Sequence, residues 1–170
     1  PEEFFESELP DAVENGIRIR MIGSRVRLPA HVIETMDEAI EATQENAAMR
    51  LTFAHSYGGR GEIVEAARRL LRDHDLDKND PESLDEKRFA QYLDDPEMPD
   101  VDLLIRTGCE WRISNFLLWQ LAYAELYVSD VMWPDFTRED LEAAILDYQS
   151  RERRYGQISA QVQGEGGSTS

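Results

Sequence analysis

The stretch VDLLIRTGCEWRISNFLLWQLAYAE, residues 101–125, contains a short apolar run, two arginines, a second apolar run and a terminal glutamate. Its first part, residues 101–105, has the composition of a buried strand. Arg106 follows this strand directly, and ligands of open parallel sheets bind outside the carboxyl ends of the strands. The stretch therefore predicts a fixed cation at a ligand-binding edge of a sheet.

Two more apolar, β-rich runs, residues 17–22 and 51–54, are expected to form strands. Segments with helical periodicity alternate with the strands, an order typical of a parallel sheet. The sequence therefore predicts an α/β fold, a parallel β-sheet flanked by helices, and its length of 170 residues suits one domain. The predicted helices are residues 30–48, 61–72 and 84–93.

Two further helices are expected toward the carboxyl end. Residues 115–123 are strongly apolar and predict a buried helix, with Ser114 as a candidate N-cap. Residues 138–154 carry an apolar stripe opposite a charged face, with Thr137 as N-cap and Asp140 at the capping-box position. The polar, Gly/Ser-rich residues 157–170 are expected to be a disordered tail.

The chain is strongly acidic, with 35 Asp and Glu against 18 Lys and Arg, a formal net charge of −17. Nucleic-acid partners are excluded on this ground, because phosphate backbones are bound by excess Lys and Arg. Lys78 and Lys87 are the only lysines. We hypothesise a salt-loving source, whose dense carboxylate surface stays solvated in brine; an ordinary acidic protein from a GC-rich genome is the alternative.

Location and redox chemistry also follow from the composition. No apolar run reaches the roughly 20 residues of a membrane helix, and the start PEEFFESELP lacks the features of a signal peptide. We therefore expect a cytoplasmic protein without a transmembrane segment. The single cysteine, Cys109, cannot form an internal disulfide, so redox chemistry is not expected.

The residues after the third strand suggest an anion site. Arg106, Arg112 and Ser114 would combine two guanidiniums, a hydroxyl and the free N–H groups of a helix N-terminus. Gly108 would let the backbone turn closely between the two arginines. These groups suit a diphosphate better than a single carboxylate, although surface salt bridges are the alternative for each arginine.

Glu125 suggests a metal ligand. A carboxylate beside an apolar run is costly unless it meets a cation, which could be a magnesium ion held against a diphosphate or an arginine in a salt bridge. A straight helix would place Ser114 and Glu125 about 16 Å apart. The helix must therefore end early and the chain fold back, or Glu125 must serve a site shared with another subunit.

The same residues resemble a known signature. The sequence RTGCEWRISNFLLWQLAYAE is similar to the pattern R-T-G-G-E-x-R-x-S-N-F-L-L-W-Q, followed by A-Y-x-E, of the cis-prenyltransferase (undecaprenyl diphosphate synthase) family. The resemblance extends to IRIRMIG at residues 17–23, SYGGRGEIVEAAR at 56–68 and RERRYG at 151–156. It covers nearly the whole chain except the tail.

The resemblance implies an enzyme that condenses isopentenyl diphosphate onto an allylic diphosphate with magnesium. The product would be a long-chain polyprenyl diphosphate for a glycosyl carrier lipid, made by a cytoplasmic homodimer with peripheral membrane association as an option. It further implies that Arg106, Arg112, Ile113 and Ser114 bind isopentenyl diphosphate and that Glu125 binds Mg²⁺.

Three residues depart from the family pattern. Cys109 replaces the second glycine of the signature and adds a small side chain to the loop. Trp111 stands where some members have a metal-assisting histidine, and an indole cannot ligate a metal. His55 stands in place of a common asparagine, where a packed or loop histidine is the expected role.

The family's amino-terminal motif D-G-N-x-R-W does not occur in this sequence. Residues 1–156 therefore resemble the carboxyl-terminal portion of the enzyme, and no catalytic residue is assigned in the chain, which we expect to be inactive alone. Two readings follow: a homodimeric enzyme when intact, or a half-site or non-catalytic subunit that associates with a complete chain. Arg151, Arg153 and Arg154 would form a solvated helix end or reach a partner's diphosphate across the dimer.

Overall fold

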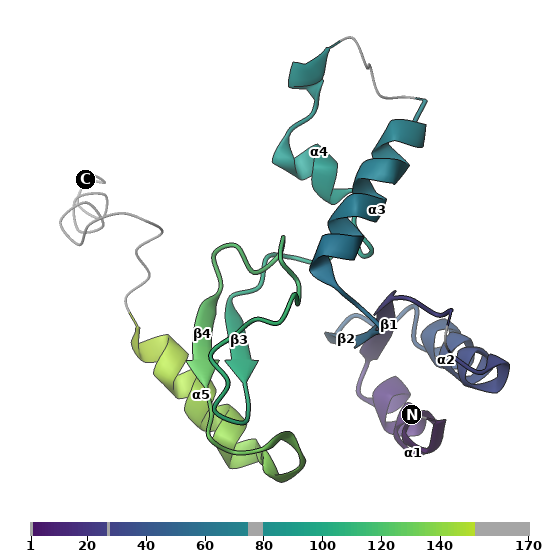
Figure 1. Cartoon of the computed structure of the whole chain (residues 1–170). Helices are drawn as coiled ribbons and strands as arrows, with labels where there is room; N and C mark the ends of the chain where they lie inside the picture. The colour runs from purple at the N-terminus through teal and green to yellow at the C-terminus, as the bar shows by residue number, and fades with distance from the viewer. Residues whose placement is uncertain (1, 27, 75–79, 152–170) are drawn as a thin grey trace, which may run out of the picture. The chain divides into compact units, whose positions relative to one another are not determined.

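The structure, a computed structural model, describes residues 2–26, 28–74 and 80–151 (Figure 1). The chain divides into two compact units, Pro1–Met98 and Pro99–Ser170. Each unit is built around its own pair of parallel strands. The expectations for Arg153, Arg154 and the tail at 157–170 lie outside the described residues.

In the first unit, strands β1 (Ile17–Gly23) and β2 (Met49–His55) pair in parallel, from Ile17 opposite Met49 to Gly23 opposite His55. Both strands were predicted, because each is an apolar run beside a turn. The helix α2 (Ala30–Ala42) connects them, as a parallel pair requires. The other elements are α1 (Glu2–Glu14), α3 (Gly59–Arg72), a 3₁₀ turn at Pro81–Ser83 and α4 (Glu86–Ala90).

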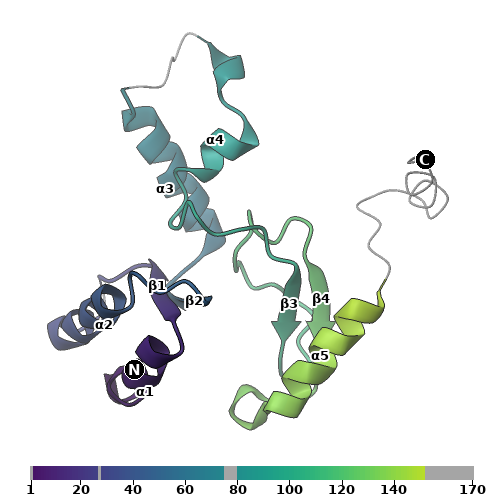
Figure 2. The same ribbon diagram turned by 180° about the vertical axis from the view of Figure 1, so that it is seen from behind.

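One face of the β1–β2 pair is covered by α1 and α2, which lie on the same side of the strands in both views (Figures 1 and 2). Apolar side chains from the three elements form the core of this unit. The core determines the register, because a one-residue slip would turn the apolar residues of β1 to the opposite face. Its buried members are Ala12, Ile19, Val32, Met36 and Ala39.

The helix predicted over residues 30–48 ends earlier, at Ala42. Thr43, which is fully buried, marks the end: its hydroxyl accepts a hydrogen bond from the Ile19 N–H at 3.0 Å and donates to the Ala39 carbonyl at 2.8 Å. The side-chain amide of Asn46 then donates to the Ile17 carbonyl at 2.9 Å. These bonds attach the end of α2 to β1 and turn the chain toward β2.

The second unit contains the parallel strands β3 (Leu103–Arg106) and β4 (Glu125–Val128), a 3₁₀ turn at Trp133–Asp135 and helix α5 (Arg138–Ser150). The helix lies along β4 (Figures 1 and 2). The predicted capping box is confirmed: the Thr137 N–H donates to Asp140 Oδ2 at 2.8 Å, and Thr137 Oγ1 accepts from the Asp140 N–H.

The buried helix predicted over residues 115–123 is wrong. The chain passes through turns there, and Ser114, Asn115 and Leu117 have φ of 49°, 63° and 42°, which no right-handed helix contains. Ser114 is therefore not an N-cap. The apolar character is used differently, since Leu117 is 8% exposed in a turn, and the run ends in the strand β4, which the sequence pattern did not separate from it.

Candidate functional site

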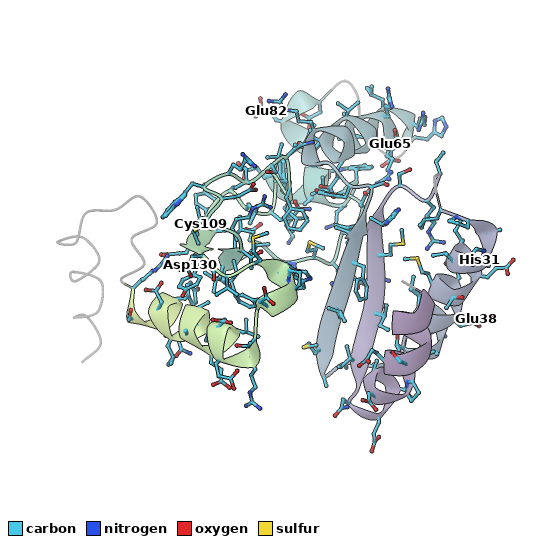
Figure 3. The ribbon with its side chains drawn as sticks, turned by 60° about the horizontal axis from the view of Figure 1, so that its bottom comes forward. His31, Glu38, Glu65, Glu82, Cys109 and Asp130 are labelled. Atoms are coloured by element: carbon cyan, nitrogen blue, oxygen red, sulfur yellow. The ribbon has the colours of Figure 1, made fainter. Side chains whose placement is uncertain are left out.

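Main-chain hydrogen bonds join the turns that follow β3 and β4. The Ser129 N–H donates to the Arg106 carbonyl at 2.8 Å, the Gly108 N–H to Val131 at 2.9 Å and the Cys109 N–H to Ser129 at 2.9 Å. Cys109 and Asp130 lie on these neighbouring turns (Figure 3). These bonds hold the two turns at the carboxyl edge of the strand pair together, and a binding site on an α/β sheet needs such a rigid support.

The turn after β3 is sharp because two successive residues are left-handed. Gly108 has φ of 76° and Cys109 has φ of 56°. A Cβ at position 108 would also lie 3.2 Å from the sulfur of Met132, so glycine suits this position on two grounds. The Cys109 side chain is exposed, so the side chain that replaces the glycine of the signature has room. The left-handed backbone at this residue is unfavourable for any side chain with a Cβ.

The turn brings Glu110 back between the two arginines of the predicted anion site. Its Oε2 accepts from Nη2 of Arg106, and its Oε1 accepts from Nη2 of Arg112. The hydrogen bond from Arg106, together with the charge of Arg112, lowers the pKa of the Glu110 carboxyl below its ordinary value. Two guanidiniums thus converge on one carboxylate of the same loop through charge-assisted hydrogen bonds.

Glu110 was not among the residues predicted for the site. Two signals were available: its position, four residues after Arg106 and two before Arg112, and its match to the glutamate of the pattern R-T-G-G-E-x-R. Arg106 has additional donor capacity, because its Nε is buried and has no hydrogen-bond partner within the described part of the chain. Buried donors are rarely left unsatisfied, so this atom is one of a few exceptions among the described residues.

Ile113 and Ser114 lie on the same loop. Ile113 is 41% exposed and Ser114 is exposed, with its hydroxyl on a left-handed backbone. Because no helix begins here, the N–H groups and dipole of a helix N-terminus do not contribute to the site. The groups that the loop could offer to an anion are therefore the two guanidiniums and the Ser114 hydroxyl.

Glu125 lies at the other end of the strand pair from Arg106. It is the first residue of β4 and pairs with Leu103, whereas Arg106 pairs with Val128. Three residues of strand separate these positions by about 10 Å. Within one chain, the arginine pair and Glu125 therefore do not form one cluster.

Glu125 has an arginine partner. Its Oε2 accepts from Nη1 of Arg151 at 2.8 Å, and the second amine of Arg151 pairs with Asp147. The hydrogen bond to Glu125 raises the pKa of Arg151 above its ordinary value, with a smaller contribution from Asp147. The salt bridge considered as an alternative for Glu125 is thus present, and its side chain is 25% exposed.

A magnesium site needs hard oxygen ligands, and the carboxylate of Glu125 is of that kind. Among residues 2–26, 28–74 and 80–151, no group of three or more His, Cys, Asp or Glu residues could hold a metal ion. Glu125 therefore fits one position of a magnesium site, with Arg151 as the competing cation. The described residues do not supply a complete site.

A second ligand-sized place lies in the first unit, at the carboxyl ends of β1 and β2. It is a hollow of about 490 Å³ beside the start of α3. Glu62, which is 5% exposed, accepts a hydrogen bond from the Tyr57 hydroxyl and another from the Asp94 N–H at 3.1 Å. The lining residues are Gly23, Ser24, Val26, Ser56, Tyr57, Gly58, Gly61, Glu62, Glu65, Arg69 and Asp94.

Comparison with known proteins places the chain in a family. The family model described as undecaprenyl diphosphate synthase matches residues 1–156. The chain belongs to this family. The resemblance seen in the sequence and the predicted α/β fold are thereby confirmed.

Curated relatives in the family are longer than this chain. The isoprenyl transferase of Bacillus cereus is 46% identical over 158 residues, which are 93% of this chain and 61% of that protein. The isoprenyl transferase of Chlorobaculum tepidum is 47% identical over 150 residues, 88% of this chain and 57% of that protein. The chain thus spans about three fifths of the length of these relatives.

Two solved structures in the family are similar. Lavandulyl diphosphate synthase from Lavandula x intermedia, crystallised with dimethylallyl diphosphate, has a TM-score of 0.85 and 36% identity, covering 92% of this chain and 68% of that one. A probable undecaprenyl diphosphate synthase from Campylobacter jejuni has a TM-score of 0.74 and 37% identity, covering 91% and 72%. Both structures support the α/β fold of this chain.

Proposed function

We propose that the protein containing these residues is a cis-prenyltransferase. It condenses isopentenyl diphosphate onto an allylic prenyl diphosphate and makes a long-chain polyprenyl diphosphate for a glycosyl carrier lipid. The observation that carries the proposal is the convergence of Arg106 and Arg112 on one carboxylate at the end of β3, in a chain of this family.

In this proposal Arg106 and Arg112 bind the diphosphate of isopentenyl diphosphate through charge-assisted hydrogen bonds. Ser114 adds a hydroxyl, and Ile113, exposed between them, supplies an apolar contact to the isopentenyl group. The residues act by positioning the substrate and neutralising its charge. The family supports this assignment, and the geometry of the two guanidiniums is consistent with it.

We propose Mg²⁺ as the cofactor and Glu125 as one of its protein ligands. When bound, the ion would neutralise charge on a diphosphate. Glu125 would exchange its ion pair with Arg151 for this role, which is feasible because the pair is partly exposed. The other ligands would be diphosphate oxygens, water and residues outside the described set.

A homodimer is proposed because Glu125 and the arginine pair lie at opposite ends of the β3–β4 pair. A second subunit could bring its own Glu125 to the arginines, which is the shared site considered above for Glu125. The described residues include no helix long and apolar enough to cross a membrane. A cytoplasmic location, with peripheral association at the membrane that receives the product, remains part of the proposal.

The test uses the intact gene product with labelled isopentenyl diphosphate and farnesyl diphosphate, with Mg²⁺ or with a chelator. Magnesium-dependent extension into butanol-soluble polyprenyl diphosphates is the expected result. A product of one condensation would contradict the long-chain assignment. Activity that appears only after a second, complete family member is added would favour the alternative, a half-site or non-catalytic subunit.

A further inference from the structure

We infer that Glu110 is a positioning residue for isopentenyl diphosphate binding. It holds the guanidiniums of Arg106 and Arg112 side by side while leaving donors on each for the diphosphate. Glu110 matches the glutamate of the signature R-T-G-G-E-x-R, and the family match gives that glutamate no role. The inference rests on the proposed function of the two arginines.

The first step is the division of the Glu110 carboxylate between two cations. One oxygen accepts from Arg106 and the other from Arg112, so neither guanidinium has a bidentate partner in Glu110. A guanidinium carries five N–H donors. Each arginine therefore keeps donors that can bind a diphosphate while Glu110 holds the remaining edge.

Glu110 also reduces the repulsion between the two arginines. Two guanidiniums close enough to share one carboxylate repel each other when no anion lies between them. A glutamate is ionised at neutral pH, so the three groups carry a net charge of about +1, whereas the two arginines alone would carry +2. Glu110 thus stabilises the convergent arrangement before substrate arrives, which is preorganisation.

Glu110 also restricts the mobility of the Arg112 side chain. The Arg112 side chain is 67% exposed, whereas those of Arg106 and Glu110 are 34% and 35% exposed. A long exposed side chain loses rotamer freedom on binding. By pairing with Arg112, Glu110 restricts that freedom in advance, and the turn at Gly108 and Cys109 holds the Glu110 backbone in place.

The inference is tested by steady-state kinetics of the complete enzyme carrying Glu110→Gln, Arg112→Ala or both. Glutamine keeps the length of the side chain but offers one acceptor oxygen and no charge. Glu110→Gln is expected to raise KM for isopentenyl diphosphate at least fivefold, with kcat and KM for the allylic substrate changed less than twofold. In the Arg112→Ala background the rise in KM should be smaller than in the parent enzyme, because Glu110 then holds Arg106 alone.

Glu142→Gln is the matched control, since it removes a carboxylate that pairs with Arg138 on the exposed side of α5. Its KM values should equal those of the parent enzyme. Thermal unfolding of each variant separates positioning from folding. If Glu110→Gln does not fold, Glu110→Asp, which keeps the charge and is one methylene shorter, should show the same selective rise in KM.

An unchanged KM in Glu110→Gln would overturn the inference, as would a lowered KM, which would make Glu110 a competitor of the diphosphate. Equal effects of Glu110→Gln with and without Arg112 would also overturn it. The proposed function fails in a different way: Arg112→Ala itself would then leave KM for isopentenyl diphosphate unchanged.

Discussion

The Oε2 of Glu125 lies 2.8 Å from Nη1 of Arg151, so the proposed metal ligand is held by a cation from the end of α5. The same guanidinium donates to the Leu126 carbonyl at 3.1 Å. The pair connects the first residues of β4 to the residue that follows α5. It also means that magnesium must replace an existing counter-ion.

Glu125→Gln is expected to lower kcat and raise the Mg²⁺ concentration needed for half-maximal activity, because the amide removes a ligand charge with little change of shape. Initial rates over a magnesium titration provide the measurement. Asp147→Asn is the control, since Asp147 pairs with the same Arg151. If both variants shifted the magnesium requirement equally, the effect would belong to Arg151 and not to a metal ligand.

Arg112→Ala is expected to weaken isopentenyl diphosphate binding. The loss should be near the lower end of the range for charge pairs, about 2 kcal/mol or roughly 30-fold in KM. The 67% exposure of the side chain is the reason for the low value. Kinetics of Arg138→Ala, which removes an 83% exposed arginine from α5, give the control, and an unchanged KM in Arg112→Ala would refute the site.

Cys109→Gly is expected to stabilise the protein by about 1 kcal/mol. The left-handed backbone at Cys109 penalises any Cβ, and this gain exceeds the entropy that glycine adds to the unfolded chain. Chemical denaturation measures the free energy of unfolding. Cys109→Ala keeps the Cβ and should show no gain, so an equal gain in both variants would attribute the effect to loss of the thiol.

Glu62→Ala is expected to destabilise the first unit by about 2 to 3 kcal/mol. Glu62 is buried, and its removal leaves the Tyr57 hydroxyl and the Asp94 N–H without this acceptor. Tyr57→Phe removes a single donor and should cost about 1 kcal/mol. Denaturation curves that placed the two variants together would show that the carboxylate has no structural role of its own.

Salt is expected to stabilise the protein if the source is salt-loving. Carboxylates crowd the outer face of α2, where Glu34, Glu38 and Glu41 are exposed, and Figure 3 shows Glu38 on this helix. Their repulsion is screened by salt. Urea unfolding in 0.1 to 2 M KCl measures the free energy of unfolding at each salt concentration. Glu38→Gln should reduce the increase of this free energy with KCl concentration. Stability independent of KCl would favour the ordinary acidic protein.

The first two strands could be predicted because each is an apolar run of ordinary strand length beside a turn. The segment after Ser114 could not, because its continuous apolar character suits a buried helix and a packed turn equally. The left-handed backbone at Leu117 carries no mark in the sequence, and the tolerance of asparagine for this conformation at Asn115 is too weak a signal to end a helix. Helix α1 was also not predicted.

The candidate site was predicted in part for a related reason. Arg106 follows its strand directly, so its place at the carboxyl edge depended only on local sequence. The separation of Arg106 from Glu125 depends on the register of β3 with β4, and the bond from Glu110 to both arginines depends on the turn between them. Neither relation is encoded in spacing alone.

The main-chain hydrogen bonds between the turns after β3 and β4 also have a practical consequence for detecting ligands. Trp111 lies between Glu110 and Arg112 and is 79% exposed, on a loop attached to Ser129 and Val131 by main-chain hydrogen bonds. An indole in that place is an intrinsic fluorophore. Its emission should change when pyrophosphate displaces water around the guanidiniums, which gives a direct optical titration of the site without any turnover.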